Sequence, residues 1–195
     1  MVIYGFIFAS ISIILSLLIF KEEASMVSVF LTVMISIPLM YSTTKFEENE
    51  DLKINNEKIL LKQHWKALKF FVFLFFGFII AYSIWFIALP EETTQSLFTA
   101  QLTTINTINS KISGNLLVDS GILLRIFMNN VKVMLFSLFF SLFFGAGAIF
   151  ILTWNASVIG AAMGTFATEK LGIFGTYFIS FPLSLMRYMT HGVFE

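Results

Sequence analysis

The sequence predicts an all-α, polytopic membrane protein with five to six membrane segments, the last two short or re-entrant, plus amphipathic surface helices. Of its 195 residues, 57% are hydrophobic and 12% are charged, whereas about a quarter of a soluble domain is charged. The 25 phenylalanines exceed what a soluble domain can hide, because such a domain buries only about 70% of its unfolded surface. The apolar residues also gather in long runs, which is the pattern of helices that span lipid.

Composition also excludes several function classes. Twelve basic residues balance twelve acidic residues, so no net field draws the chain to nucleic acid. The sequence contains no cysteine, and this removes disulfides, thiolate nucleophiles and cysteine metal sites. It also lacks a phosphate-binding glycine loop, a serine nucleophile elbow and a helical zinc motif. We therefore expect no cofactor, no metal, no nucleic-acid partner and no enzymatic activity.

Two apolar runs near the start, 2–20 and 26–41, predict a helical hairpin over residues 1–43. The first run is uncharged and, at about 1.5 Å per residue, nearly crosses a hydrocarbon core of about 30 Å. It does not fit a signal peptide, because no basic segment precedes it and Lys21-Glu22-Glu23 follows instead of a cleavage site. The short connection between the runs predicts that the two helices are neighbours.

The polar segment 44–69 predicts a loop and an amphipathic helix that leads directly into a third span, 70–89. Its second half repeats lysines at helical spacing beside a row of apolar residues. This pattern is typical either of a helix on an anionic leaflet or of the ordinary positive charge that flanks a span. The candidate ligands of lipid headgroups are Lys58, Lys62, Lys66 and Lys69.

The distribution of lysines predicts the orientation of the chain. Lysines concentrate in 44–69 and are sparse in the first hairpin and in 90–118. By the positive-inside rule, 44–69 and the N-terminus face the cytoplasm and 90–118 faces outward. We therefore expect a multi-pass protein of the cell membrane, with lipid as one of its partners.

The extracytoplasmic segment 90–118 predicts a surface helix. It is rich in Thr, Ser, Asn and Gln, and its apolar residues recur every three to four positions from Phe98 to Ile112. Such a helix lies on lipid or on the bundle, and we expect it to break at Ser113-Gly114-Asn115. Asp119 then has the chemistry of an N-cap for the next helix.

The remaining part, 119–195, is expected to contain the motif-bearing helices of the single membrane domain 1–195. Its longest apolar run, 133–154, predicts a fourth span. The next run, 156–168, is too short for an upright span, and the last, 171–189, contains a proline and an arginine. These features predict a final pair of short, tilted or re-entrant helices.

A polar group near the end of the sequence is the first candidate for function. Arg187, His191 and Glu195 follow at i, i+4 and i+8, so a continuous helix places them on one face. A charged side chain inside a span costs about 2.5–3.5 kcal/mol, which makes such residues functional candidates. The group suits a proton relay, a metal site or an ion-pair ladder, although zinc usually needs more ligands. Alternatively, Arg187 marks the membrane interface and the other two lie outside lipid.

Asparagines and small residues around the fourth span form two further groups. The asparagines either cap helix ends or bond across helices, and they are Asn129, Asn130 and Asn155. Small side chains let helix backbones approach closely in lipid, where no hydrophobic drive holds helices together. We expect the second group to pack helices, and it consists of Gly145, Gly147, Ala156, Gly160 and Gly164.

The order of these motifs resembles the integral membrane family named after stage II sporulation protein M. The residues that carry the resemblance are 126–133 (Ile-Phe-Met-Asn-Asn-Val-Lys-Val), 145–147 (Gly-Ala-Gly), Asn155, Gly160, Gly164 and 191–195 (His-Gly-Val-Phe-Glu). The early segments 17–20 and 37–40, with the acidic stretch that follows, resemble archaeal members in particular. Where the family usually has Asn-Gly, this chain has Asn155-Ala156, and where the family usually has Pro-His-Gly, this chain has Thr190-His191-Gly192. The resemblance implies a multispanning helical protein whose namesake anchors a complex that remodels cell wall, a role not expected of an archaeal chain.

Three hypotheses for the function follow. The first is a non-enzymatic scaffold or complex subunit that presents helices 57–69 and 91–112 to other membrane proteins or to a second copy. The second is a transporter or permease component, with a polar path lined by Asn130, Asn155, Arg187, His191 and Glu195. The third is an intramembrane enzyme that uses His191 and Glu195.

Overall fold

The computed structural model describes residues 1–51, 57–113 and 146–171 and the single positions 128, 131 and 135. Every regular element within these residues is an α-helix. Four helices are long and apolar enough to cross a membrane, and they are α1 (Val2–Ile19), α2 (Ala24–Asp51), α3 (Glu57–Ala88) and α7 (Ala146–Leu171). The predicted fold class, an all-α multi-pass transmembrane protein, is confirmed.

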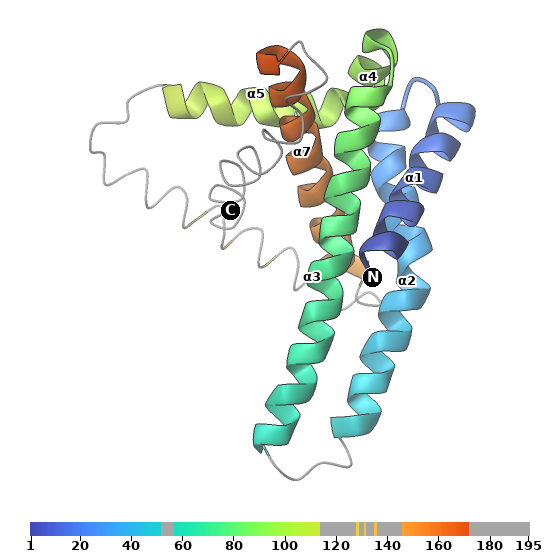
Figure 1. The fold of residues 1–195 in the computed structure, drawn as a ribbon, viewed down its shortest axis with the longest axis vertical. Coiled ribbons are helices and arrows are strands. Elements are labelled where there is room, and N and C mark those ends of the chain that lie inside the picture. The colour runs from blue at the N-terminus through green and yellow to red at the C-terminus, as the bar shows by residue number, and fades with distance from the viewer. Residues whose placement is uncertain (52–56, 114–127, 129–130, 132–134, 136–145, 172–195) are drawn as a thin grey trace.

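The first two helices form an antiparallel pair that packs along α3 (Figure 1). α1 ends where the backbone N–H of Phe20 bonds to the carbonyl of Ser16, and the chain then turns through Lys21 to Glu23 into α2. α2 continues well beyond its apolar run, to Asp51, and α3 begins in the polar segment at Glu57. Together they extend past the N-terminus of α1 as a two-helix stalk, formed by residues 42–51 and 57–69 (Figure 1).

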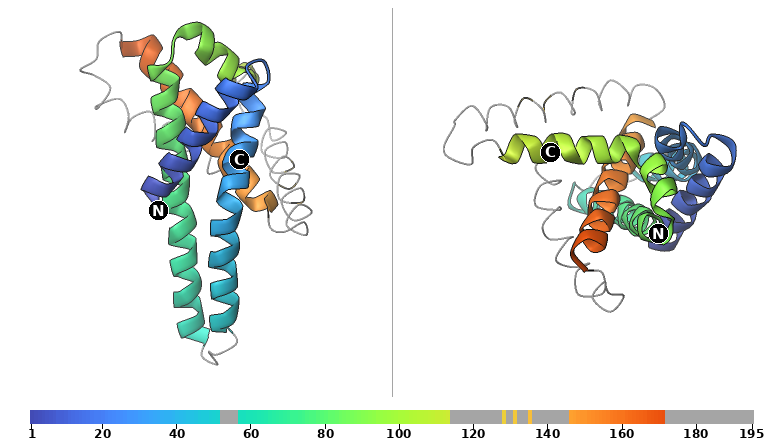
Figure 2. Two further views of the ribbon diagram at one scale, coloured as in Figure 1. Left: turned by 90° about the vertical axis from the view of Figure 1, so that its right-hand side faces the viewer. Right: turned by 90° about the horizontal axis from the view of Figure 1, so that it is seen from above.

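α3 is the central helix and lies between α1 and α7 (Figure 2). It crosses α1 at two glycines, Gly5 and Gly77. A Cβ atom on Gly5 would lie 2.5 Å from the carbonyl oxygen of Leu74 and 3.1 Å from Gly77 Cα. Because both neighbours are backbone atoms, neither helix has room for a larger residue at this point.

α7 corrects the predicted end of the fourth span. The prediction ended that span at Trp154 and treated 156–168 as a separate short segment, but α7 continues without a break from 146–154 through 156–168. Within this stretch Ser157 is fully buried, and its Oγ donates to the Trp154 carbonyl at 2.8 Å. The drop in hydropathy therefore marks an interior face, and 171–189 lies outside the described residues except for Leu171.

The end of the bundle opposite the stalk is covered by two shorter helices. α4 (Glu91–Leu97) follows Pro90, and α5 (Thr99–Ser113) then lies across the ends of the long helices (Figure 1). The predicted surface helix is thus two helices that separate at Phe98. Thr94 Oγ1 donates to the carbonyls of Phe86 and Leu89, both at 3.3 Å, so α4 also closes the C-terminal end of α3.

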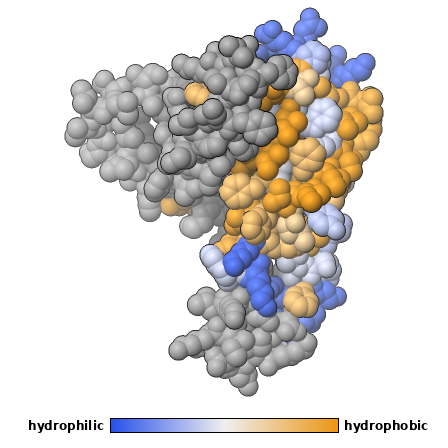
Figure 3. Space-filling model, in the orientation of Figure 1, coloured by the Kyte–Doolittle hydropathy of each residue, from blue (hydrophilic) through white to orange (hydrophobic). Residues whose placement is uncertain are grey.

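The outer surface has the polarity that a membrane requires. Figure 3 shows an apolar belt between a polar end at α4 and the polar stalk. On α1, Ile3 and Leu18 are 72% and 71% exposed. Side chains of this kind are stable when exposed only if lipid is the solvent.

Candidate functional site: a polar seam between the helices

Most residues of the predicted polar site lie outside the described part of the chain. This holds for Asn129, Asn130, Arg187, His191 and Glu195, and for Gly145 of the small-residue group. The proton relay, the metal site, the ion-pair ladder and the interfacial alternative all remain predictions for this group.

Asn155 is the one predicted polar candidate that the structure describes. It lies in the interior of α7 and is partly exposed, so it does not cap a helix end. Its neighbours Thr153 and Ser157 are fully buried instead. The alternative that Asn155 caps a helix end is therefore wrong, because this residue lies on the side of a continuous helix.

The small residues of α7 lie against α3. A Cβ atom on Gly160 would lie 2.6 Å from Tyr82 Cβ and 3.1 Å from the backbone nitrogen of Ser83. One on Gly164 would lie 2.5 Å from Cγ of Phe86. Gly147 and Ala156 are also buried. These contacts bring α7 and α3 close enough for their backbones and β-carbons to touch.

The four lysines of the predicted amphipathic helix lie on the stalk part of α3, which has no break between 57–69 and the span. This segment therefore runs in line with the span and does not lie flat on a leaflet. At about 1.5 Å per residue, Lys62 and Lys58 are about 12 and 18 Å from Phe70, whereas a headgroup layer is roughly 5–8 Å deep. By this rise Lys66 and Lys69 lie within the headgroup layer, and the lipid contacts of the four lysines stay a prediction.

The structure reveals a set of buried polar side chains that we term the seam, which the sequence analysis did not identify. Its members come from α2, α3, α5 and α7 and are hydroxyl groups and one amide. They are Ser25, Ser28, Thr32, Ser36, Tyr82, Gln101, Thr153 and Ser157. The four on α2 recur every three or four residues, so they occupy one face of that helix.

Gln101 joins three helices at one end of the seam. Its Oε1 accepts a hydrogen bond from Ser25 Oγ on α2 at 2.8 Å, and its Nε2 donates to Ser157 Oγ on α7 at 3.2 Å. The backbone N–H of Ala100 also donates to Ser25 Oγ, at 3.1 Å. Gln101 is fully buried, so these bonds fasten α5 to the bundle across a surface that water does not reach.

Tyr82 joins α3 to α2 about two turns further along the seam. Its hydroxyl lies 3.1 Å from Thr32 Oγ1 and donates to the carbonyl of Ser28 at 3.4 Å. Thr32 Oγ1 bonds to the same carbonyl at 2.8 Å. The three groups satisfy one another in the interior, where an unpaired polar group is costly.

The chemistry of the seam is hydrogen bonding, between helices at Ser25, Gln101, Ser157, Thr32 and Tyr82 and within a helix at Ser36 and Thr153. Its members supply hydroxyls, a phenol and an amide, and none is an imidazole, carboxylate or amine that would activate a nucleophile. Among the described residues, Ser83 on α3, beside the Gly160 contact, is the one buried polar side chain with no hydrogen-bond partner. Within the same residues, no cluster of three or more His, Cys, Asp or Glu side chains is placed to hold a metal.

Comparison with known proteins identifies one family. Residues 67–195 match the family described as stage II sporulation protein M, which covers about two thirds of the chain. No curated protein and no solved structure matches the chain. The matched part begins inside α3, so the seam joins residues within it, such as Gln101 and Ser157, to residues of α2 that precede it.

Proposed function

This chain belongs to the stage II sporulation protein M family, and on that premise we propose that it is a non-enzymatic scaffold or subunit of a complex in the cell membrane. A scaffold must hold distant surfaces in a fixed relation. The observation that best supports the proposal is the fastening of α5 by Gln101 to both α2 and α7. That connection fixes an outer helix relative to the spans, and the stalk extends from the opposite end of the same spans (Figure 1).

The proposed orientation places the stalk and the N-terminus in the cytoplasm and α4 and α5 outside. Support comes from the charges at the two ends. The stalk carries lysines such as Lys45, Lys66 and Lys69, whereas the end formed by α4 and α5 carries two pairs of acids beside two lysines, Lys21 and Lys111. The acids at that end are Glu22, Glu23, Glu91 and Glu92.

Cysteine labelling tests this orientation, because the chain has no cysteine of its own. Ser42→Cys and Thr99→Cys introduce exposed thiols at the stalk and on α5. In intact cells, a membrane-impermeant maleimide should label only the second, and both should react after permeabilisation. Labelling of the first alone would reverse the orientation.

The partner is proposed to be another membrane protein or a second copy of this chain, contacted through α5 or the stalk. A photo-crosslinking residue placed at Thr103 or at Glu48, both exposed, reports on each surface in native membranes. The matched control is Ile7, which is 43% exposed on the apolar face of α1. We expect a defined protein adduct from Thr103 or Glu48 and only lipid adducts from Ile7.

The seam makes this experiment more specific. If Gln101 holds α5 in its working position, Gln101→Leu should abolish the adduct formed from Thr103 and leave the one formed from Glu48 intact. Lipid adducts alone at all three positions would remove the scaffold proposal. Among the described residues no observation specifically favours the transporter alternative, since of its proposed path only Asn155 is placed.

A further inference from the structure

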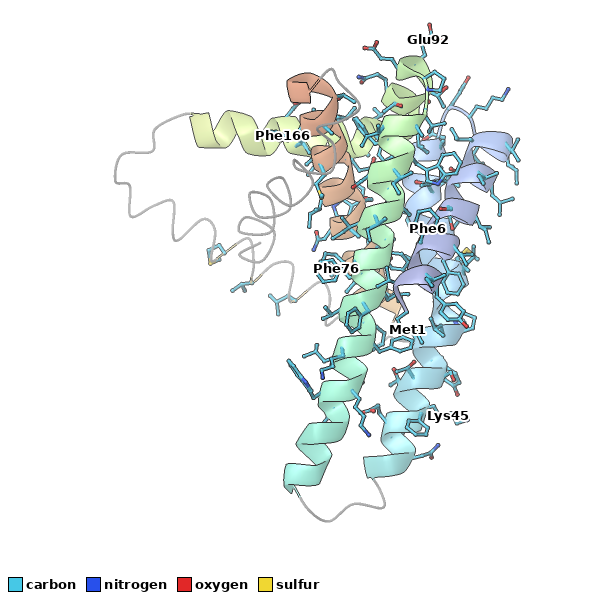
Figure 4. The ribbon with its side chains drawn as sticks, viewed as in Figure 1. Met1, Phe6, Lys45, Phe76, Glu92 and Phe166 are labelled. Carbon is cyan, nitrogen blue, oxygen red and sulfur yellow. The ribbon has the colours of Figure 1, made fainter. Side chains whose placement is uncertain are left out.

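Two lysine–aromatic pairs lie where the stalk joins the spans. On α2, Lys45 Nζ is 5.6 Å from the centre of the Tyr41 ring, and on α3, Lys69 Nζ is 5.5 Å from the Trp65 ring. Both rings are well exposed, Tyr41 at 60% and Trp65 at 55%. Figure 4 shows Lys45 on the side of α2 that faces away from α3. We refer to these four residues as the collar.

The two lysines lie at about the same height on the stalk. α2 and α3 are antiparallel, and two contacts fix their register. Thr32 lies beside Tyr82, and further along Glu47 Oε2 lies 3.3 Å from His64 Nδ1. This register places Lys45 level with residues 66–69 of α3, with the Tyr41 ring one turn toward the spans and the Trp65 ring one turn toward the stalk tip.

That height coincides with one edge of the apolar belt. The uncharged part of α3 begins directly after Lys69 and continues to the end of the helix at Ala88. At about 1.5 Å per residue this part is about 30 Å long, the thickness of a hydrocarbon core. At its far end lies the α1–α2 turn, where Ser96 Oγ donates to the carbonyl of Lys21 at 3.1 Å. The collar is thus one hydrocarbon thickness from the opposite polar edge.

The charges at the collar favour an anionic ligand. Neither Lys45 nor Lys69 takes part in an ion pair within the described residues, so both ammonium groups are open to an external anion. Glu47 is engaged by His64, and Glu48, three residues from Lys45 on α2, is the exposed acid beside the collar. The opposite edge carries Glu22, Glu91 and their neighbours, which would repel the same ligand.

We propose that the collar binds the phosphate groups of anionic lipids in the leaflet on the stalk side. Each lysine donates hydrogen bonds to phosphate oxygens. The Tyr41 ring, one turn toward the hydrocarbon from Lys45, contacts the glycerol and the upper acyl chain, whereas the Trp65 ring, one turn farther out than Lys69, lies among the headgroups. The cation–π contact holds the ammonium over an apolar ring at the level where headgroup and hydrocarbon meet. Because two helices contribute, bound lipid also fixes how far the hairpin stands out of the membrane. This proposal is independent of the scaffold function.

Lipid binding to the purified, full-length protein tests the proposal. Native mass spectrometry would compare retention of phosphatidylglycerol and phosphatidylcholine by the wild type, by Lys45→Gln/Lys69→Gln and by Lys21→Gln, which removes an exposed lysine at the opposite edge. We expect the wild type to prefer phosphatidylglycerol. The double variant should bind it about tenfold more weakly, and Lys21→Gln should bind it as the wild type does.

Two further measurements distinguish lipid binding at the collar from a simple anion site and from misfolding of the variants. Inorganic phosphate in excess should not displace the lipid, because it lacks the chain that contacts the Tyr41 ring, and displacement would indicate a simple anion site. Thermal unfolding of each variant in detergent should match the wild type, since the collar side chains are on the surface. Equal binding of the two lipids, an unaffected double variant, or an equal loss in Lys21→Gln would each overturn the proposal.

Discussion

α3 contacts α1 and α2 in different ways. Toward α1 the closest contact is backbone against backbone, through Gly5 and Gly77, and one side-chain hydrogen bond accompanies it, from Trp85 Nε1 to Ser10 Oγ at 3.1 Å. Toward α2 the contact includes polar side chains, with the Tyr82 hydroxyl between Thr32 and Ser28. Both kinds of contact hold helices together in lipid, whose tails are as apolar as the helices and provide no hydrophobic drive for association.

The two contacts should therefore tolerate mutation differently. A backbone contact has no spare space and fails when any atom is added, since dense interiors cannot absorb extra volume. A hydrogen-bonded contact loses only the net value of its bonds, which is modest because alternative partners exist within the helix. Substitutions at the two kinds of contact can therefore be ranked.

The largest effect is expected for Gly77→Ala. The added Cβ would collide with the carbonyl of Val2 and lie 2.9 Å from Gly5 Cα, and both are backbone atoms that cannot rotate away. Alanine gains up to about 1 kcal/mol in helix propensity, but separating two helices costs about 3 kcal/mol or more. We expect a net loss of about 2 kcal/mol or more, measured by thermal unfolding in detergent. Ala88→Leu, at an exposed position of the same helix, should be nearly neutral.

The next effect distinguishes two glycines on α7. Gly160 faces the fixed backbone of Ser83 and Ile79 as well as Tyr82 Cβ, whereas Gly164 meets only the side chain of Phe86. Gly160→Ala should therefore destabilise by about 1–3 kcal/mol and Gly164→Ala by less. Adding Phe86→Leu should recover part of the second loss and none of the first. Equal effects at both glycines would mean that α7 shifts as a whole and that the contact is not tight.

Hydropathy and length were enough to predict the first three spans. An uncharged run of sufficient length has few other structures available, so 2–20 and 70–89 correspond closely to α1 and the apolar part of α3. The predicted end of the fourth span, at Trp154, was wrong because it also rested on hydropathy. Hydropathy averages a helix over all its faces, and in α7 the polar residues near Asn155 lie partly on a buried face that bonds to other helices.

The seam could have been found from spacing but not from hydropathy. Serine and threonine are nearly neutral on hydropathy scales, yet Ser25, Ser28, Thr32 and Ser36 recur at helical spacing within an apolar run. Their partners could not be predicted, because Gln101 reaches Ser25 only after the chain has turned at Pro90 and at Phe98. The same limit applies to Gly5 and Gly77, which are single glycines in separate helices.

A smaller effect is expected for Gln101→Leu. Leucine has a similar volume but removes both bonds, to Ser25 and to Ser157, whose hydroxyls keep local partners in Ala100 and Trp154. The loss should be about 1–2 kcal/mol, and it should be local to α5. Hydrogen exchange of backbone amides in 99–107 should rise while exchange in α1 stays unchanged. Gln95→Leu, at an exposed position of α4, is the control and should alter neither region.

The smallest effect is expected for Tyr82→Phe, which removes one oxygen from the centre of the bundle. Thr32 keeps its bond to the Ser28 carbonyl at 2.8 Å, so no donor in this group is left without an acceptor. The ring keeps its edge contact with Phe98, whose centre lies 6.3 Å away. The loss should therefore be about 0.5–1 kcal/mol, the range of interhelical hydrogen bonds in membranes. Tyr41→Phe, on the exposed collar, should be neutral in detergent. A loss at Tyr82 as large as that of Gly77→Ala would show that the polar contact with α2 holds α3 as strongly as the glycine crossing with α1 does.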